Sequence, residues 1–175
     1  SVQAALTAAH LRLQIAIRDN TDPERAAVLA QAEAEEAVRF AVDFDAPPTP
    51  MLEVVENLTA TWSGICQVRR RLAVNDLKWM DTDPVCARAV AEILLETTFN
   101  AVKHGHAEYV EIDCTWPNWR SLELIVSNNG SAPDPTSTGL GSQLIEDASI
   151  RWSRETVKGI TVVRVLLPWD GLLTD

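Results

Sequence analysis

The first part of the chain carries two stretches in which apolar residues recur every three or four positions, the spacing of one helix face. The first stretch covers residues 2–18, and the second, rich in alanine and glutamate, runs from Pro23 to about residue 44. Because only a short turn separates them, we expect an antiparallel helical hairpin over residues 1–45. Its apolar faces are small, which favours pairing with a second copy into a four-helix bundle. Docking onto the rest of the same chain is the alternative.

A proline-rich connector, Ala-Pro-Pro-Thr-Pro at 46–50, follows the hairpin, and its prolines favour an extended chain. Beyond it, the apolar pattern predicts further elements, the longest of which begins at Pro84 behind the cap residue Asp83. The predicted elements are helices over 51–63, 84–104 and 141–148 and strands over 66–74, 110–114, 122–126, 151–157 and 159–167. We therefore expect residues 51–175 to form an α+β domain. It should be a two-layer α/β sandwich, in which helices cover one face of a mixed, largely antiparallel sheet.

The end of the long predicted helix carries three polar side chains on one face. Glu96, Asn100 and Lys103 are spaced i, i+4 and i+7, so they lie in a row. An amide oxygen can bind a hard cation, a carboxylate can orient or deprotonate a nucleophile, and an ammonium can neutralise phosphate. The plain alternative is a solvated helix face.

Two glycine-containing segments come later in the chain. Asn128-Asn129-Gly130 follows an alternating strand, and Thr138-Gly139-Leu140-Gly141 leads into a predicted helix. Glycine lets the backbone approach a ligand closely, and a helix N-terminus offers unpaired N–H groups. Together with the polar helix end, these segments predict a site for a phosphate-bearing ligand.

This order of motifs resembles the ATP-binding module shared by histidine kinases, type II topoisomerases, MutL-type repair proteins and heat-shock chaperones, over roughly residues 51–168. The short loop and the strand that begins Arg151-Trp152-Ser153 resemble the small two-component sensor kinases that regulate nitrate response and membrane-lipid desaturation. The resemblance implies ATP and Mg²⁺ as cofactors. It also implies transfer of the γ-phosphate to a histidine and then to an aspartate of a response regulator.

The resemblance also assigns roles to individual residues. Glu96 matches the acid that polarises the attacking group, and Asn100 matches the Mg²⁺ ligand. The positions that match contacts to ATP are Asn100, Lys103, His104, Asn128, Gly130, Gly139, Leu140, Gly141 and Thr161. Asn128 replaces an aspartate that accepts a hydrogen bond from the adenine amino group, and Ala132 replaces a glycine. An amide oxygen can still accept that bond without charge assistance, so adenine affinity should fall about tenfold or more.

The hairpin resembles the dimerisation and phosphoacceptor segment of the same kinases. The acceptor histidine is expected either immediately upstream of Ser1 or at His10, which is followed by Gln14. Because the chain opens in a helical pattern without methionine, we expect it to be part of a longer protein. Two alternatives remain. One is a non-catalytic phosphorelay or docking protein with a degenerate ATP site, which Asn128 and Ala132 favour; the other is an anti-sigma-factor serine kinase, which the hairpin disfavours.

Composition and charge narrow the expected partners. The 175 residues carry a net charge of −10 at pH 7, so no nucleic-acid binding is expected, because a phosphate backbone needs a basic surface. No apolar stretch approaches the roughly 20 residues that span a bilayer. We expect a cytoplasmic homodimer without membrane contact, from a parent protein that can itself be membrane-anchored. The separated residues Cys66, Cys86 and Cys114 predict reduced core thiols.

Overall fold

The computed structural model describes residues 48–131 and 145–171. The described helices are α3 (Met51–Thr61), α4 (Val74–Met80) and α5 (Pro84–Lys103), and the strands are β1 (Gln67–Arg70), β2 (Tyr109–Asn118), β3 (Ser121–Asn128), β4 (Arg151–Val157) and β5 (Ile160–Pro168). Of the predicted helix over 141–148, residues 145–148 are described, and they are helical. The predicted hairpin and the segment Gly139-Leu140-Gly141 lie outside the described residues.

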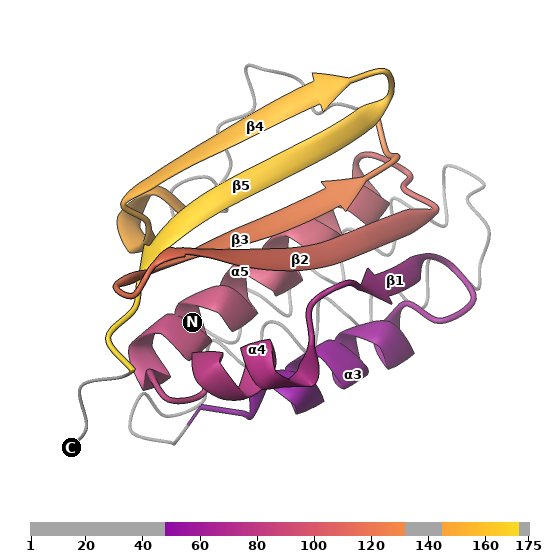
Figure 1. Ribbon diagram of the computed structural model, residues 1–175. Helices are drawn as coiled ribbons and strands as arrows, with labels where there is room; N and C mark the ends of the chain where they lie inside the picture. Colours follow the sequence, from indigo (N-terminus) through magenta and orange to yellow (C-terminus); the bar gives the residue numbers. More distant parts are fainter. Residues whose placement is uncertain (1–47, 132–144, 172–175) are drawn as a thin grey trace, which may run out of the picture. The chain divides into compact units, whose positions relative to one another are not determined.

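The five strands form one mixed sheet in the order β1-β2-β3-β5-β4. β1 runs parallel to β2, whereas the other three neighbouring pairs are antiparallel. Figure 1 shows the helices on one side of the sheet, with α5 passing behind β2 and β3 in this view. The predicted two-layer α+β arrangement is therefore confirmed for the described part of the chain.

The core lies between α5 and the inner face of the sheet. Along β3 and β5, buried side chains alternate with more exposed ones, which is the period of two that a half-covered sheet requires. The fully buried side chains include Val90, Ile93, Leu94, Ile112, Leu122, Leu124, Val165 and Leu167. None of the described helices combines the length and the apolar character that crossing a membrane requires.

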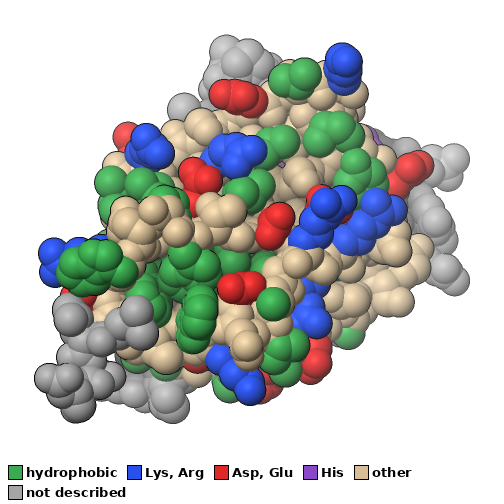
Figure 2. All heavy atoms as spheres, viewed as in Figure 1, with side chains coloured by type: hydrophobic (Ala, Val, Ile, Leu, Met, Phe, Trp, Pro, Cys, Tyr) green, Lys and Arg blue, Asp and Glu red, His purple; other side chains and the backbone are tan. Residues whose placement is uncertain are grey.

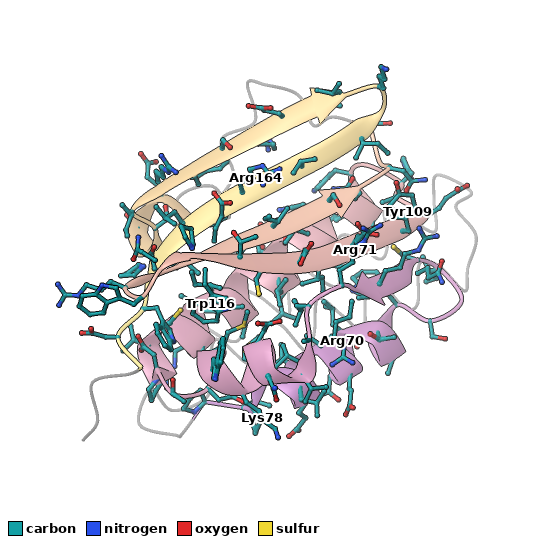
Figure 3. The ribbon with its side chains drawn as sticks, viewed as in Figure 1. Arg70, Arg71, Lys78, Tyr109, Trp116 and Arg164 are labelled. Carbon is teal, nitrogen blue, oxygen red and sulfur yellow. The ribbon has the colours of Figure 1, made fainter. Side chains whose placement is uncertain are left out.

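The opposite face of the sheet carries charged and apolar side chains together. Arg71 Nε lies 2.8 Å from Glu111 Oε1, and Arg164 Nη1 lies 3.7 Å from Glu123 Oε2; both arginines are labelled in Figure 3. Figure 2 shows acidic, basic and apolar side chains interspersed on this side of the molecule. Because exposed ion pairs contribute about 1 kcal/mol or less, the stability of the fold comes mainly from the buried face.

The long helix α5 begins where the sequence predicts. Asp83 Oδ1 accepts the backbone N–H groups of Val85 and Cys86, each at 3.0 Å, and Pro84 occupies the first helical turn, where no N–H is needed. The second carboxylate oxygen, Oδ2, accepts the N–H of Asp170 at 2.9 Å. One side chain thus caps α5 and also anchors the segment that follows β5.

The stretch after β1 differs from the prediction of a strand over 66–74. The strand is shorter, and Val74–Met80 forms the helix α4. The Asp76 carboxylate accepts the N–H of the residue before the helix at 2.8 Å, and Leu77 and Met80, three positions apart, are buried. An acidic residue at the third helical position and apolar residues three positions apart both indicate a helix. Two apolar positions form too short a pattern, however, to distinguish a helix from a continuation of the preceding strand.

The two antiparallel hairpins agree with the predictions to different degrees. The strands predicted over 151–157 and 159–167 form β4 and β5, which are joined through Lys158 and Gly159 with φ angles of 52° and 78°, as a type I′ hairpin loop requires. The strand predicted over 110–114 is longer than expected, because β2 continues to Asn118 with an irregularity after Thr115. A proline at 117 cannot donate to the ladder, which accounts for an irregularity rather than a turn at that place.

Three tryptophans pack where α4 meets the sheet. The Trp116 ring centroid lies 5.9 Å from that of Trp79 and 4.8 Å from that of Trp169, with the rings close to edge-on. The indole N–H of Trp116, labelled in Figure 3, donates to Asp76 Oδ1 at 3.2 Å. Such aromatic pairs contribute about 0.5–1.5 kcal/mol beyond simple burial, so the cluster helps to hold α4 against β2.

The three cysteines are free thiols, and we expect two of them to be chemically inert in the folded chain. Burial, reinforced by the charge of Asp83, raises the pKa of Cys86 to about 12. Burial, reinforced by Asp76 and Asp113, raises the pKa of Cys114 to about 12. At pH 8, about one in ten thousand of these thiols is therefore ionised. Iodoacetamide should label them at pH 8 only after guanidinium unfolds the chain, as mass spectrometry would show; rapid labelling of either in the folded chain would contradict this expectation.

Candidate functional site

A pocket opens between the C-terminal half of α5 and the strands β3, β4 and β5. Four residues predicted for the site, Glu96, Asn100, Asn128 and Thr161, are among those that line it. The other described lining residues are Thr97, Ala101, Gly105, Ser131, Ile145, Trp152, Arg154 and Val163. The structure therefore brings together predicted residues as far apart in the chain as Glu96 and Thr161.

Glu96 and Asn100, both half-buried, are bonded to each other on the side of α5 that lines the pocket. Asn100 Nδ2 donates to Glu96 Oε1 at 2.6 Å, as two side chains one helical turn apart can. This bond uses the nitrogen of the amide, so the Asn100 oxygen is not engaged by the carboxylate. A neutral amide oxygen and a carboxylate oxygen are both ligands that Mg²⁺ accepts, so this pair could hold a hard cation at the edge of the pocket.

Gly105 and Gly130 bring the end of α5 against the segment that follows β3. The N–H of Ser131 donates to the Gly105 carbonyl at 2.8 Å. A Cβ atom added to Gly105 would lie 2.7 Å from the Ala101 carbonyl oxygen, and one added to Gly130 would lie 2.9 Å from the Gly105 carbonyl oxygen. Both positions therefore require glycine because of space. Gly130 is a predicted site residue; Gly105 is not, although it ends the motif on the predicted helix.

Asn128 and Thr161 form the buried side of the pocket. They are directly opposed in the β3–β5 ladder, so their side chains share one face, and they are only 6% and 3% exposed. Asn128 Oδ1 accepts the N–H of Gly130 at 2.9 Å. The hydroxyl of Thr161 shares a hydrogen bond of 2.9 Å with the hydroxyl of Thr156 on β4. Both polar side chains are thereby held in defined orientations.

Two predicted phosphate contacts do not line the pocket. The Lys103 ammonium lies 4.8 Å from the centre of the Phe99 ring, a favourable cation–π arrangement, and His104 is the C-terminal cap residue of α5. Lys103 is also about 4.5 Å farther along the helix axis than Asn100, because each residue adds about 1.5 Å. The roles predicted for Lys103 and His104, like those for Gly139, Leu140 and Gly141, stay predictions.

Trp152 and Arg154, which line the pocket from β4, are site residues that were not predicted from the sequence. They are two positions apart, so their side chains lie on the same side of the strand. Arg154 is the basic side chain among the described lining residues. The strand was predicted, but its sequence does not alternate between apolar and polar residues, so it did not indicate which side of the strand faces the site.

No protein-family model and no curated protein sequence matches this chain. Solved structures do match it. The blue-light activated histidine kinase of Erythrobacter litoralis EL346 aligns with a TM-score of 0.52 and 16% identity, over 83% of this chain and 46% of that protein. The chain thus spans less than half the length of that kinase.

Two further solved structures are similar to this chain. The ATP binding domain of PrrB from Mycobacterium tuberculosis aligns with a TM-score of 0.51 and 16% identity, over 69% of this chain and 91% of that domain. The Acinetobacter baumannii histidine kinase AdeS aligns with a TM-score of 0.51 and 13% identity, over 96% of each chain. At these identities the similarity concerns the fold and does not single out a subgroup of kinases. The described domain has the fold of histidine kinase ATP-binding domains.

Proposed function

We propose that this chain is the ATP-binding catalytic portion of a sensor histidine kinase of a two-component system, of the nitrate-response and desaturase-regulator type. The observation that carries the proposal is the bonded pair Glu96–Asn100 beside a pocket whose buried side is formed by Asn128 and Thr161. The fold shared with histidine kinases supports it. A helix face that is merely solvated would not be expected to border a pocket with two buried polar side chains, Asn128 and Thr161, on its other side.

The residues present fit Mg²⁺-ATP. Asn100 would bind Mg²⁺ through its amide oxygen, and the cation would neutralise charge on the phosphate oxygens. Glu96 would hold Asn100 in place through the observed hydrogen bond and would orient the attacking group with its carboxylate. The adenine ring would occupy the part of the pocket between Ile145 and Val163, next to Thr161. Catalysis of phosphoryl transfer is mostly positioning and charge neutralisation, which these side chains can supply.

The phosphate acceptor would be a histidine of the predicted hairpin over residues 1–45. Its position is either immediately upstream of Ser1 or at His10, and the phosphate would then pass to an aspartate of a response regulator. The hairpin would also join two copies of the chain in the cytoplasm. The non-catalytic docking protein remains the second candidate function, because Asn128 replaces the aspartate expected at that position.

Calorimetric titration of ATP into the whole chain, with and without Mg²⁺, tests the proposal. We expect one ATP per chain and much tighter binding when Mg²⁺ is present. Arg164→Gln is a suitable control, because this residue lies on the opposite face of the sheet (Figure 3) and is half-exposed; its affinity should equal that of the unmodified chain. Absence of binding at millimolar ATP would overturn the kinase proposal and favour the docking protein.

A further inference from the structure

The two buried polar side chains of the pocket are placed to select the ring that enters it. Asn128 and Thr161 are more than nine-tenths buried, and the neighbouring lining residues Ile145 and Val163 are apolar. In such surroundings, a ligand that leaves a buried polar group without a hydrogen-bond partner binds much more weakly. The donors and acceptors on these two side chains therefore determine which ring edge can bind well.

The hydrogen bond from Gly130 fixes which way the Asn128 amide points. A backbone N–H can pair only with the oxygen of an amide, so the bond of 2.9 Å from Gly130 to Oδ1 excludes the flipped orientation. The Gly130 backbone is itself held, because Ser131 N–H bonds to Gly105 and a Cβ on Gly130 would lie 2.9 Å from the Gly105 carbonyl oxygen. Asn128 consequently offers its second polar atom, Nδ2, as a hydrogen-bond donor.

Thr161 stands beside this donor and can accept. It is the direct cross-strand neighbour of Asn128, and its hydroxyl is joined to that of Thr156 at 2.9 Å. A hydroxyl carries two acceptor lone pairs and one proton. Whichever of the two threonines donates in this bond, Thr161 keeps a lone pair for a ligand N–H. The edge presented by the pocket is therefore a donor, Asn128 Nδ2, next to a hydroxyl that can accept.

We propose that this site binds 6-oxopurine triphosphates, such as those of hypoxanthine and guanine, more tightly than ATP. A 6-oxopurine places a carbonyl oxygen, which can accept from Asn128 Nδ2, next to a ring N–H, which can donate to Thr161. Adenine would instead place its amino group, a donor, beside the Nδ2 donor, and this amino group would have to share the Asn128 oxygen with the Gly130 N–H. This inference deepens the proposed function and rests on it, because it assumes that a nucleoside triphosphate occupies the pocket.

The test compares ATP, ITP and GTP by Mg²⁺-containing calorimetry on the whole chain. ITP is the matched probe, because its base differs from adenine only by the oxygen at position six and the proton on the adjacent nitrogen. We expect ITP to bind about tenfold or more tightly than ATP, since one mismatched buried pair costs about that factor. Equal affinities, or tighter binding of ATP, would overturn the inference and leave the proposed function standing. No binding of any of the three would overturn both.

Asn128→Asp tests the assigned atoms directly. One carboxylate oxygen can still accept from Gly130 N–H, while the other becomes an acceptor in place of Nδ2, so the preference should reverse toward ATP. Asn118→Asp is the matched control, because Asn118 Oδ1 likewise accepts the N–H two residues later, that of Arg120 at 2.8 Å, at an exposed position. Its ITP-to-ATP ratio should equal that of the unmodified chain. An unchanged ratio in Asn128→Asp would overturn the assignment, and the comparison on the unmodified chain holds even if this variant folds poorly.

Discussion

Replacing Gly105 with alanine is expected to abolish nucleotide binding and to lower the free energy of unfolding by about 1–3 kcal/mol. The new Cβ would lie 2.7 Å from the Ala101 carbonyl oxygen and 3.2 Å from the Gly130 Cα. Both neighbours are backbone atoms, and the Ala101 carbonyl also accepts the N–H of Ala107 at 3.0 Å. Relief of the clash therefore has to separate the end of α5 from the segment after β3, and that separation opens the pocket.

Urea unfolding and ATP calorimetry on the same variant measure the two effects. Gly64→Ala is the control, because Gly64 has a φ of +84° and no atom within 4 Å of an added Cβ. This control should lose about 1 kcal/mol of stability through backbone strain and keep its affinity for ATP. If Gly105→Ala bound ATP as tightly as the unmodified chain, the contact between Gly105 and Gly130 would not be needed for the site.

Replacing Asn100 with alanine should weaken Mg²⁺-dependent ATP binding roughly a hundredfold, which corresponds to about 2.7 kcal/mol. The substitution removes the proposed Mg²⁺ ligand and the partner of Glu96, whose Oε1 accepts from Asn100 Nδ2 at 2.6 Å. Alanine is the better helix former, so the stability of α5 should not fall. A loss of affinity could then not be explained by unfolding.

Titration of ATP into Asn100→Ala, in Mg²⁺ and in EDTA, provides the measurement. The difference between the two conditions, which should be large in the unmodified chain, is expected to disappear. Asn57→Ala removes the same side chain from an exposed position on α3 and should bind like the unmodified chain. A persistent Mg²⁺ effect in Asn100→Ala would mean that the cation is held by other residues.

The sequence predicted those features of the fold that depend on local patterns. Alternation along β2 and β3 marks their buried faces, and the Asp83-Pro84 pair marks the start of α5, since both signals arise from neighbouring residues. The parallel pairing of β1 with β2 could not be predicted, because α4 and α5 lie between the two strands in the chain and no local pattern states where the chain returns to the sheet. The short helix α4 was missed because only Leu77 and Met80 carry its periodicity.

In the candidate site, too, local patterns predict some features and tertiary packing determines the others. Glu96 and Asn100 could be predicted because they share a helix, and the structure joins them by a hydrogen bond. The contribution of Arg154 depends on which side of β4 faces α5, and no local pattern states that. The orientation of the Asn128 amide depends on the N–H of Gly130, and the neighbouring Ser131 N–H is bonded to the carbonyl of Gly105, more than twenty positions earlier in the chain than Asn128. Such details follow from tertiary packing alone.

The two outer strands of the sheet have a consequence for self-association. An outer strand offers unpaired backbone groups to another copy of the chain, and charged side chains on it oppose aggregation through that edge. β1 carries Arg69 and Arg70, and β4 carries Arg151 and Arg154 with a single acidic residue, Glu155. Although the whole chain is acidic, both outer strands are therefore basic. If copies of the chain paired edge to edge, the arginines of one outer strand would face those of another. Like charges opposite each other are unfavourable, so these arginines oppose fibre-like assembly of the domain.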